Sequence, residues 1–358
     1  MPVNSTHPEY DAALPAWTRA RDVFAGEDAV KAGGEKYLPR LDSQDDDEYL
    51  AYKNRASFFN ATARTADSLV GLIFRRDPVL KLPDTALGVG KKLTEFCSDV
   101  DLLGTSFSAY SKKVVSEIIT VGRAGTLVDW ADDSQQRVGV VSYSAEQIIN
   151  WRMERLNGRL VLAVVVLKEV PAALVTDTIP SDTDVFVTLE TEQLRVLRLV
   201  PGKSGEWFYQ VEIWRQTQTA SDKRKNRRQE PEWTLFETRI PLRLGRPLSE
   251  IPFIFHGSRH SLPAVDKPPL NDIIVVNLDH YRLNADYKHG LHFTALPTAW
   301  VSGFDKTSSL RIGSSSAWVS ENIGANAGFL EFTGQGLTTF ERAMDRAEQL
   351  KAALCTRM

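Results

Sequence analysis

Apolar residues recur with helical spacing between residues 51 and 78. They lie alternately four and three positions apart, which places them on one face of a helix: Tyr52, Ala56, Phe59, Ala63, Ala66, Val70 and Ile73. The acidic run at 45–48 precedes this stretch, where negative charge complements the helix dipole, and Asp77-Pro78 follows it. The pattern predicts one long, capped amphipathic helix.

Two more helices are predicted near the end of the chain. One begins at Pro268-Pro269 and ends at Gly290, a residue type suited to the position just beyond a helix. The other begins near Thr338, which together with Glu341 fits a capping box. Its predicted apolar stripe consists of Leu337, Phe340, Met344, Ala347, Leu350 and Leu354.

The residues from about 138 to 256 have a different pattern, in which strand-like runs alternate with Gly, Pro, Asn and Asp. The run from Leu160 to Leu167 is short and β-branched, as in a buried strand. We expect five or six mainly antiparallel strands in this region. With helical segments before and after it, the chain is predicted to have an α+β fold.

One loop in the strand-rich region, at 221–232, is rich in positive charge. Its cations, which we call the basic loop, are Lys223, Arg224, Lys225, Arg227 and Arg228. Such a cluster is typical of a solvated hairpin tip, and it also fits a contact with DNA or with an acidic partner. The pattern alone leaves both interpretations open.

Composition narrows the function class. A chain of 358 residues predicts two or three subdomains, and its formal net charge of −3 argues against a protein that grips nucleic acid over a broad basic surface. Cys97 and Cys355 are far apart, so neither a disulfide framework nor a thiolate metal site is indicated. The chain lacks a secretory signal at its start and an apolar run long enough for a membrane span.

Motifs for catalysis or cofactor binding are not found. The stretch "LGVGKKLT", residues 87–94, contains the Gly-Lys pair of a phosphate-binding loop. Such a loop needs its first glycine at position 85, where Thr85 stands. A metal site can be imagined from His280, Asp286, His289 and His292, but His280 falls on another helical face and Gly290 is expected to end the helix. We therefore expect surface or interface histidines there, with no catalytic residue, no metal and no cofactor.

The order of several segments resembles the portal (head–tail connector) proteins of tailed bacteriophages. The segments are "GGEKYLPRL", "DDDEYLAYKNRASFFNATARTADSLVGLIFRRDP", "IINWR", "IPFIFHGSRH", "PPLNDIIVVNLDHYRLNADYKHGLH" and "FLEFTGQGL". Each segment is weakly specific, whereas the ordered set, which covers about 17–354, is considerably more specific. The resemblance implies a ring of about twelve subunits at one capsid vertex, through which DNA passes.

By position, the resemblance divides the chain into three parts. Residues 1–135 would belong to an outer wing, 136–265 to a β-rich clip with adjoining wing sheet, and 266–358 to a stem helix, a channel loop at 303–336 and the start of a channel helix. The stem or channel lining would include Asp272, Asp279, Arg282 and Asp286. The aspartates recur every seven residues and would repel the DNA backbone, while the basic loop would dock the terminase or an adaptor protein.

The implied partners are further copies of the chain, terminase, head-completion or adaptor proteins, the major capsid and scaffolding proteins, and double-stranded DNA. No membrane is involved, and the expected location is the portal vertex of a virion assembled in the bacterial cytoplasm. The resemblance implies a helical crown after the channel helix, and we expect this crown to be absent from a chain that ends at "AALCTRM". A DNA-processing enzyme and a structural adaptor that does not conduct DNA are the alternatives.

Overall fold

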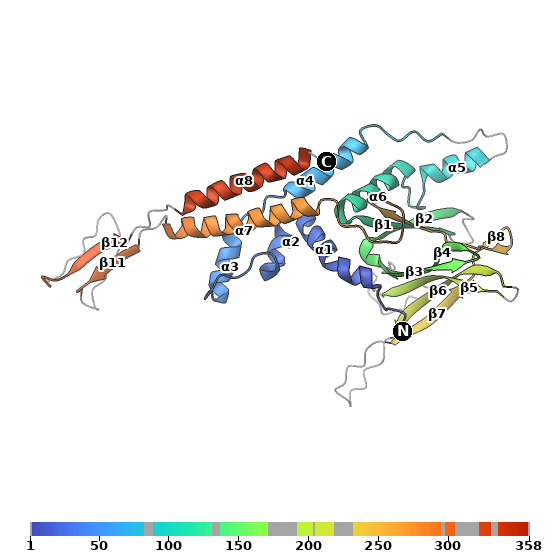
Figure 1. Cartoon of the computed structure of the whole chain (residues 1–358), viewed down its shortest axis with the longest axis horizontal. Helices are drawn as coiled ribbons and strands as arrows, with labels where there is room; N and C mark the ends of the chain where they lie inside the picture. Colours follow the sequence, from blue (N-terminus) through green and yellow to red (C-terminus); the bar gives the residue numbers. More distant parts are fainter. Residues whose placement is uncertain are drawn as a thin grey trace, which may run out of the picture. The chain divides into compact units, whose positions relative to one another are not determined.

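The structure is a computed structural model that describes residues 2–81, 89–130, 137–170, 192–202, 205–217, 232–294, 298–304, 322–330 and 336–356. Helices and antiparallel sheets both occur, which confirms the predicted α+β class (Figure 1). The chain forms two compact units. Unit 1 comprises residues 1–21 and 64–271, and unit 2 comprises 22–63 and 272–358. The two units interleave along the chain. The division into three consecutive segments remains a prediction from the sequence.

Unit 1 contains two antiparallel sheets. The first has the strand order β10-β1-β2, formed by β1 (Arg123–Trp130), β2 (Val138–Ser144) and β10 (Phe253–Gly257). The second is a meander in sequence order, formed by β3 (Ile148–Leu156), β4 (Arg159–Glu169), β5 (Gln193–Pro201), β6 (Trp207–Thr217) and β7 (Glu232–Arg239). The strand predicted at 160–167 is confirmed within β4, where burial starts at Ala163 and Leu160 is 65% exposed.

The region from 138 to 256 holds more strands than the five or six predicted. A 3₁₀ turn, Ala145–Gln147, separates β2 from β3, and Ser144 and Gln147 cap it reciprocally. The two-residue strands β8 (Leu242–Arg243) and β9 (Arg246–Pro247) form a separate small ribbon. Both features are too short to show a periodic pattern, which is why sequence reasoning missed them.

Polar contacts and aromatic rings join the two sheets of unit 1. Arg195 of β5 pairs with Asp129 of β1, and the Tyr143 hydroxyl of β2 donates to Glu169 of β4 at 2.6 Å. The rings of Trp151 in β3 and Phe255 in β10 meet edge to face. The helices in unit 1 are α5 (Val89–Ser98), α6 (Phe107–Val121) and most of α1 (Pro8–Ala25) and α4 (Ala61–Ile73).

Helix α6 covers one face of the first sheet. Ser106 caps its start, and Gly122 ends it in the left-handed conformation. Its residues Tyr110 and Val114 pack with Ala124 of β1 and Val140 of β2 in a buried cluster. Burial of this apolar face anchors the helix to the sheet.

The long helix predicted over 51–78 is wrong, because the structure has two helices there. These are α3 (Asp46–Arg55) and α4, separated by an extended segment. The amide of Ser57 donates to the Asn284 side chain at 2.8 Å, and the Asn60 side chain accepts from the amide of Ala63 at 3.0 Å. Tertiary bonding and a new helix cap thus override a continuous apolar stripe. The predicted acidic start is confirmed, since Asp45 and Glu48 form a capping box.

Unit 2 is built around two long helices. They are α7 (Asn271–Thr294) and α8 (Leu337–Thr356), and the strands β11 (Thr298–Ser302) and β12 (Asn326–Leu330) lie between them in sequence. The short α2 (Glu27–Ala32) and α3 also belong to this unit. The core includes Tyr37, Tyr52, Ile273, Tyr281 and Ala285.

The prediction that the helix after Pro268-Pro269 ends at Gly290 is wrong, since α7 continues to Thr294. A Cβ at position 290 would lie 2.8 Å from a terminal carbon of the Leu337 side chain. Gly290 therefore serves close helix packing instead of helix termination. Helix α8 starts at Leu337, so Thr338 lies within its first turn rather than before it.

Candidate functional site

The candidate site is the pair formed by α7 and α8, with the β11–β12 ribbon in the chain between them. Three contacts show that the helices are antiparallel: Tyr287 donates to Glu341, His280 pairs with Glu348, and Gly290 adjoins Leu337. In each contact one residue number rises along α7 as the other falls along α8. The helices lie side by side in Figure 1 as well.

The antiparallel arrangement places both ends of segment 295–336 at one end of the helix pair. Within that segment β11 and β12 form a two-stranded antiparallel ribbon, in which Trp300 faces Gly328. The indole of Trp300 lies against Gly328, where an added Cβ would meet it at 3.0 Å. Most of the predicted channel loop, residues 305–321 and 331–335, lies outside the described residues.

The four residues predicted to line a stem or channel differ in their surroundings. Asp272 and Asp279 are exposed on α7. Asp286 accepts a hydrogen bond from the Tyr52 hydroxyl at 2.5 Å, and Arg282 donates from Nε to the Tyr37 carbonyl at 2.8 Å. Asp286 and Arg282 thus form hydrogen bonds to other residues of unit 2. The carboxylates of Asp272 and Asp279 form no ion pair with the described residues.

The basic loop, Lys223, Arg224, Lys225, Arg227 and Arg228, lies outside the described residues. Its predicted role as a docking loop therefore remains a prediction from the sequence.

The histidines of α7 occupy protein contacts. His280 is 7% exposed and its Nε2 lies 3.3 Å from Glu348, and burial, followed by the charge of Lys351, lowers its pKa. His289 lies against Tyr52 and Arg55, and burial and then Arg55 lower its pKa. In the described part of the chain, no group of three or more His, Cys, Asp or Glu residues is placed to hold a metal ion.

Sequence reasoning missed a buried polar group between the two helices. Lys351 of α8 is 5% exposed and Asn277 of α7 is 1% exposed, and neither side chain has a hydrogen-bond partner among the described residues. Burial lowers the pKa of Lys351. The sequence contained a signal for this burial, because Lys351 lies four residues after Ala347 and three before Leu354. This spacing places it on the predicted apolar stripe of the last helix.

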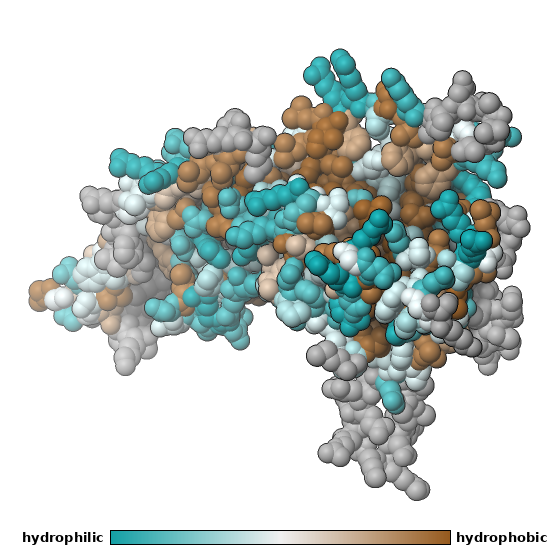
Figure 2. All heavy atoms as spheres, turned by 45° about the vertical axis from the view of Figure 1, so that its right-hand side comes forward, coloured by the Kyte–Doolittle hydropathy of each residue, from teal (hydrophilic) through white to brown (hydrophobic). Residues whose placement is uncertain are grey.

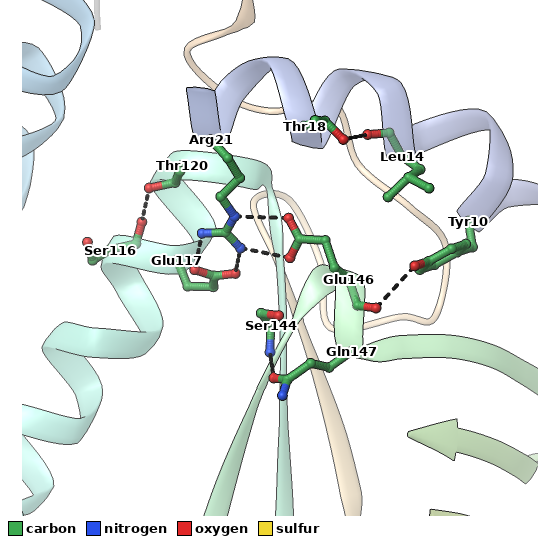
Figure 3. A network of polar contacts seen from close by, with 10 residues as sticks. All are labelled: Tyr10, Leu14, Thr18, Arg21, Ser116, Glu117, Thr120, Ser144, Glu146 and Gln147. Atoms are coloured by element: carbon green, nitrogen blue, oxygen red, sulfur yellow. Dashed lines mark hydrogen bonds and ion pairs between the residues drawn. The ribbon is translucent and has the colours of Figure 1, made fainter. Parts of the chain in front are cut away.

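Figure 3 shows a second polar network that the sequence did not predict, in unit 1. The Arg21 guanidinium of α1 lies between two carboxylates, Glu117 of α6 and Glu146 of the 3₁₀ turn. Burial alone would lower the pKa of Arg21, but hydrogen bonds to Glu117 and then to Glu146 raise it. Burial opposes ionisation of Glu146, and the bond to Arg21 nevertheless lowers its pKa. The network holds α1 against α6 and the turn.

Two hollows lie in unit 1, and neither has the residues of an active site. One, of about 820 Å³, adjoins Asn157, Arg159 and Trp207, and the other, of about 500 Å³, lies between α1 and residues 265–271. Among their described lining residues there is no histidine or cysteine. Apolar side chains, brown in Figure 2, also reach the surface among hydrophilic ones. Exposed large apolar residues of the described chain include Leu72, Val275, Leu350 and Phe329.

Known proteins match only parts of the chain or match it distantly. A family described as a domain of unknown function (DUF4055) matches residues 269–358, which include α7 and α8. No curated protein matches the sequence. None of the helices in the described residues is both long enough and apolar enough to cross a membrane.

Two solved structures are similar to the chain at 10% sequence identity. One is the neck of an empty gene transfer agent (GTA) particle computed with C6 symmetry, with a TM-score of 0.37, covering 80% of this chain and 64% of that chain. The other is the virion of a native GTA particle, with a TM-score of 0.39, covering 90% of this chain and 72% of that one. The chain thus spans less than two thirds of the length of the first.

Proposed function

We propose that this chain is a structural subunit of a phage-like head or neck, and that it acts as a portal protein. Copies would form a ring at a capsid vertex, and DNA would pass through the ring during packaging and ejection. The ordered segments that resemble portal proteins support this proposal. The α7–α8 pair is the structural observation that carries it.

The helix pair fits a stem better than it fits a channel loop with a channel helix. α8 packs along α7 in antiparallel fashion, so the two helices form one rod. The chain leaves and re-enters this rod at the same end, and the segment between contains a β ribbon. In the proposed assembly α7 and α8 are stem helices, the ribbon belongs to the β-containing clip, and the sheets of unit 1 belong to the wing.

This function needs no catalytic centre, and the site's chemistry agrees with that. Most charged groups of α7 and α8 contact other groups of unit 2 or face solvent, and Lys351 is buried between the helices. A ring subunit needs two different surfaces that fit each other, because head-to-tail contacts close a ring. The partners proposed for the assembled ring are terminase, head-completion proteins, capsid and scaffolding proteins, and duplex DNA.

Electron microscopy of the purified protein, combined with mass photometry, tests the proposal. We expect annular particles with a central hole wide enough for duplex DNA. A monomer at every concentration and salt condition would contradict the proposal, and a closed particle without a hole would favour a non-conducting adaptor. DNA cleavage that requires a divalent metal would favour a DNA-processing enzyme.

The basic loop provides a test of partner docking. A variant with Lys223, Arg224, Arg227 and Arg228 replaced by serine should form rings and lose binding to terminase or adaptor in a pull-down. Loss of the rings themselves would show that the loop is structural.

A further inference from the structure

An exposed strip of α7 combines acidic and apolar side chains. Asp272, Val275, Asp279 and Arg282 are three or four residues apart, so they share one helical face, and all four are exposed. Val275 is 49% exposed. Asp272 and Asp279 form no ion pair with any described residue. We call Asp272, Val275 and Asp279 the acidic strip.

The charges of α8 are sorted between two flanks of the helix. Glu341 and Glu348 lie on the flank that contacts α7, through Tyr287 and His280. The flank that faces away carries Arg342, Arg346 and Leu350, all exposed, with Leu350 48% exposed. We call these three residues the basic flank.

The basic flank adjoins one acidic side chain of its own helix, the exposed Asp345, with which the structure shows no ion pair. Arg342 and Arg346 are four residues apart, and like charges at this spacing destabilise a helix. Neither guanidinium pairs with a carboxylate among the described residues. Positive charges at this spacing become favourable when acidic groups from another molecule lie opposite them.

No contact joins the acidic strip and the basic flank among the described residues of one copy. The α7 residues that contact α8 are His280, Tyr287 and Gly290, and none belongs to the acidic strip. The helix pair therefore presents two different patches that are not paired with each other. Two different patches that fit each other produce a head-to-tail contact, which is the type of contact that closes a ring.

We propose that the acidic strip of one copy docks on the basic flank of the next copy's α8. Asp272 and Asp279 pair with Arg342 and Arg346, and Val275 and Leu350 are covered. This inference rests on the proposed ring. It differs from a role in repelling DNA, because an exposed valine between the aspartates suits a protein contact better than a water-filled bore.

Charge reversal tests the contact. Variant A carries Asp272→Lys and Asp279→Lys, and variant B carries Arg342→Glu and Arg346→Glu. Each alone should weaken ring assembly by about tenfold or more, measured by mass photometry across protein concentrations. The protein carrying all four changes should recover assembly, because the charges are again complementary.

A matched control separates this contact from a general effect of charge. Lys112→Glu with Lys113→Glu reverses two exposed charges on α6, as variant B does on α8, and should leave assembly unchanged. Circular dichroism should show native helix content in every variant, because all the altered side chains are exposed.

The outcomes distinguish the two proposals. Wild-type rings that variants A and B leave intact would overturn this contact and leave the proposed function standing. Weakened rings that the fourfold variant fails to restore would also overturn it, because the patches then do not meet. A wild-type protein that forms no ring would overturn the proposed function together with this contact.

Discussion

The two units differ in how their charged side chains are paired. In unit 1 the central cations are neutralised internally: Arg195 pairs with Asp129 and Glu169, and Arg21 pairs with Glu117 and Glu146. In the α7–α8 pair of unit 2 some charges face solvent without partners and one lysine is buried without an acceptor. The difference suggests that unit 1 is complete as a single copy, whereas the helix pair is completed by assembly.

Arg123 is an instructive exception in unit 1. It is 2% exposed and has no carboxylate partner, and burial lowers its pKa to about 10. Its guanidinium lies over the rings of Trp151 and Phe255, and Nη1 donates to the Pro263 carbonyl at 2.5 Å. Aromatic faces and a backbone oxygen thus replace a counter-ion, although Nε and Nη2 of Arg123 have no hydrogen-bond partner among the described residues.

Gly122→Ala should cause the largest effect and should be confined to unit 1. Gly122 has φ +82°, and an added Cβ would lie 2.8 Å from the Lys267 carbonyl oxygen. Left-handed strain and the clash together should lower the free energy of unfolding by about 3 kcal/mol in a urea titration. Gly158→Ala is the control, because Gly158 has φ +80° with open space around it and should lose only about 1 kcal/mol. Equal losses would show that the Lys267 contact is unimportant.

Arg21→Ala should cause the next largest loss, about 2 kcal/mol, because it leaves two half-buried carboxylates unpaired. Chemical denaturation followed by tryptophan fluorescence would measure it. The control is Arg239→Ala, which removes the pair with Glu237, where the Arg239 side chain is 68% exposed, and should cost less than about 0.5 kcal/mol. Similar losses would mean that the Arg21 network adds nothing beyond a surface pair.

Lys351→Met should act in the opposite direction and stabilise unit 2 by about 1 kcal/mol, since it removes a buried ammonium that lacks an acceptor. Hydrogen exchange of α7 and α8 amides should slow down. Lys53→Met, at a half-buried position of α3, should change exchange little. Faster exchange in Lys351→Met would indicate that the ammonium has a partner.

Mild acid should produce the smallest effect, in the helix pair. The pKa values of His280 and His289 are lowered in the folded protein, so the unfolded chain binds more protons and stability falls as the pH drops through about 6.5. Amide exchange in α7, corrected for intrinsic pH dependence, should therefore be faster at pH 6 than at pH 7.5. A double variant with His280→Gln and His289→Gln should lose this dependence, and a wild type without it would contradict the assignment.

The sequence predicted features that depend on local periodicity and capping. The α+β class, the acidic helix start at 45–48, the strand within 160–167 and a helix through Asp279 all appear in the structure. These features need only neighbours a few residues away. The sequence also grouped the aspartates of α7, of which the structure leaves Asp272 and Asp279 exposed and ties Asp286 to Tyr52.

The features that failed depend on distant residues. The break at 56–60 requires Asn284, and the helical position of Gly290 requires Leu337. Lys351 is buried because α8 packs on α7, an arrangement that composition does not reveal. The contacts that decide these positions join residues separated by tens or hundreds of positions, which periodicity does not register.

Residues 295–336, which we call the tip, leave and re-enter the α7–α8 rod at one end. The rod therefore fixes the positions of both ends of the tip. Lengthening such a segment is inexpensive, since each doubling of a flexible loop adds only about 0.6 kcal/mol of closure entropy. Insertions or grafts at this tip should leave the register of the two helices intact. Related chains should therefore diverge fastest at the tip and slowest along the rod.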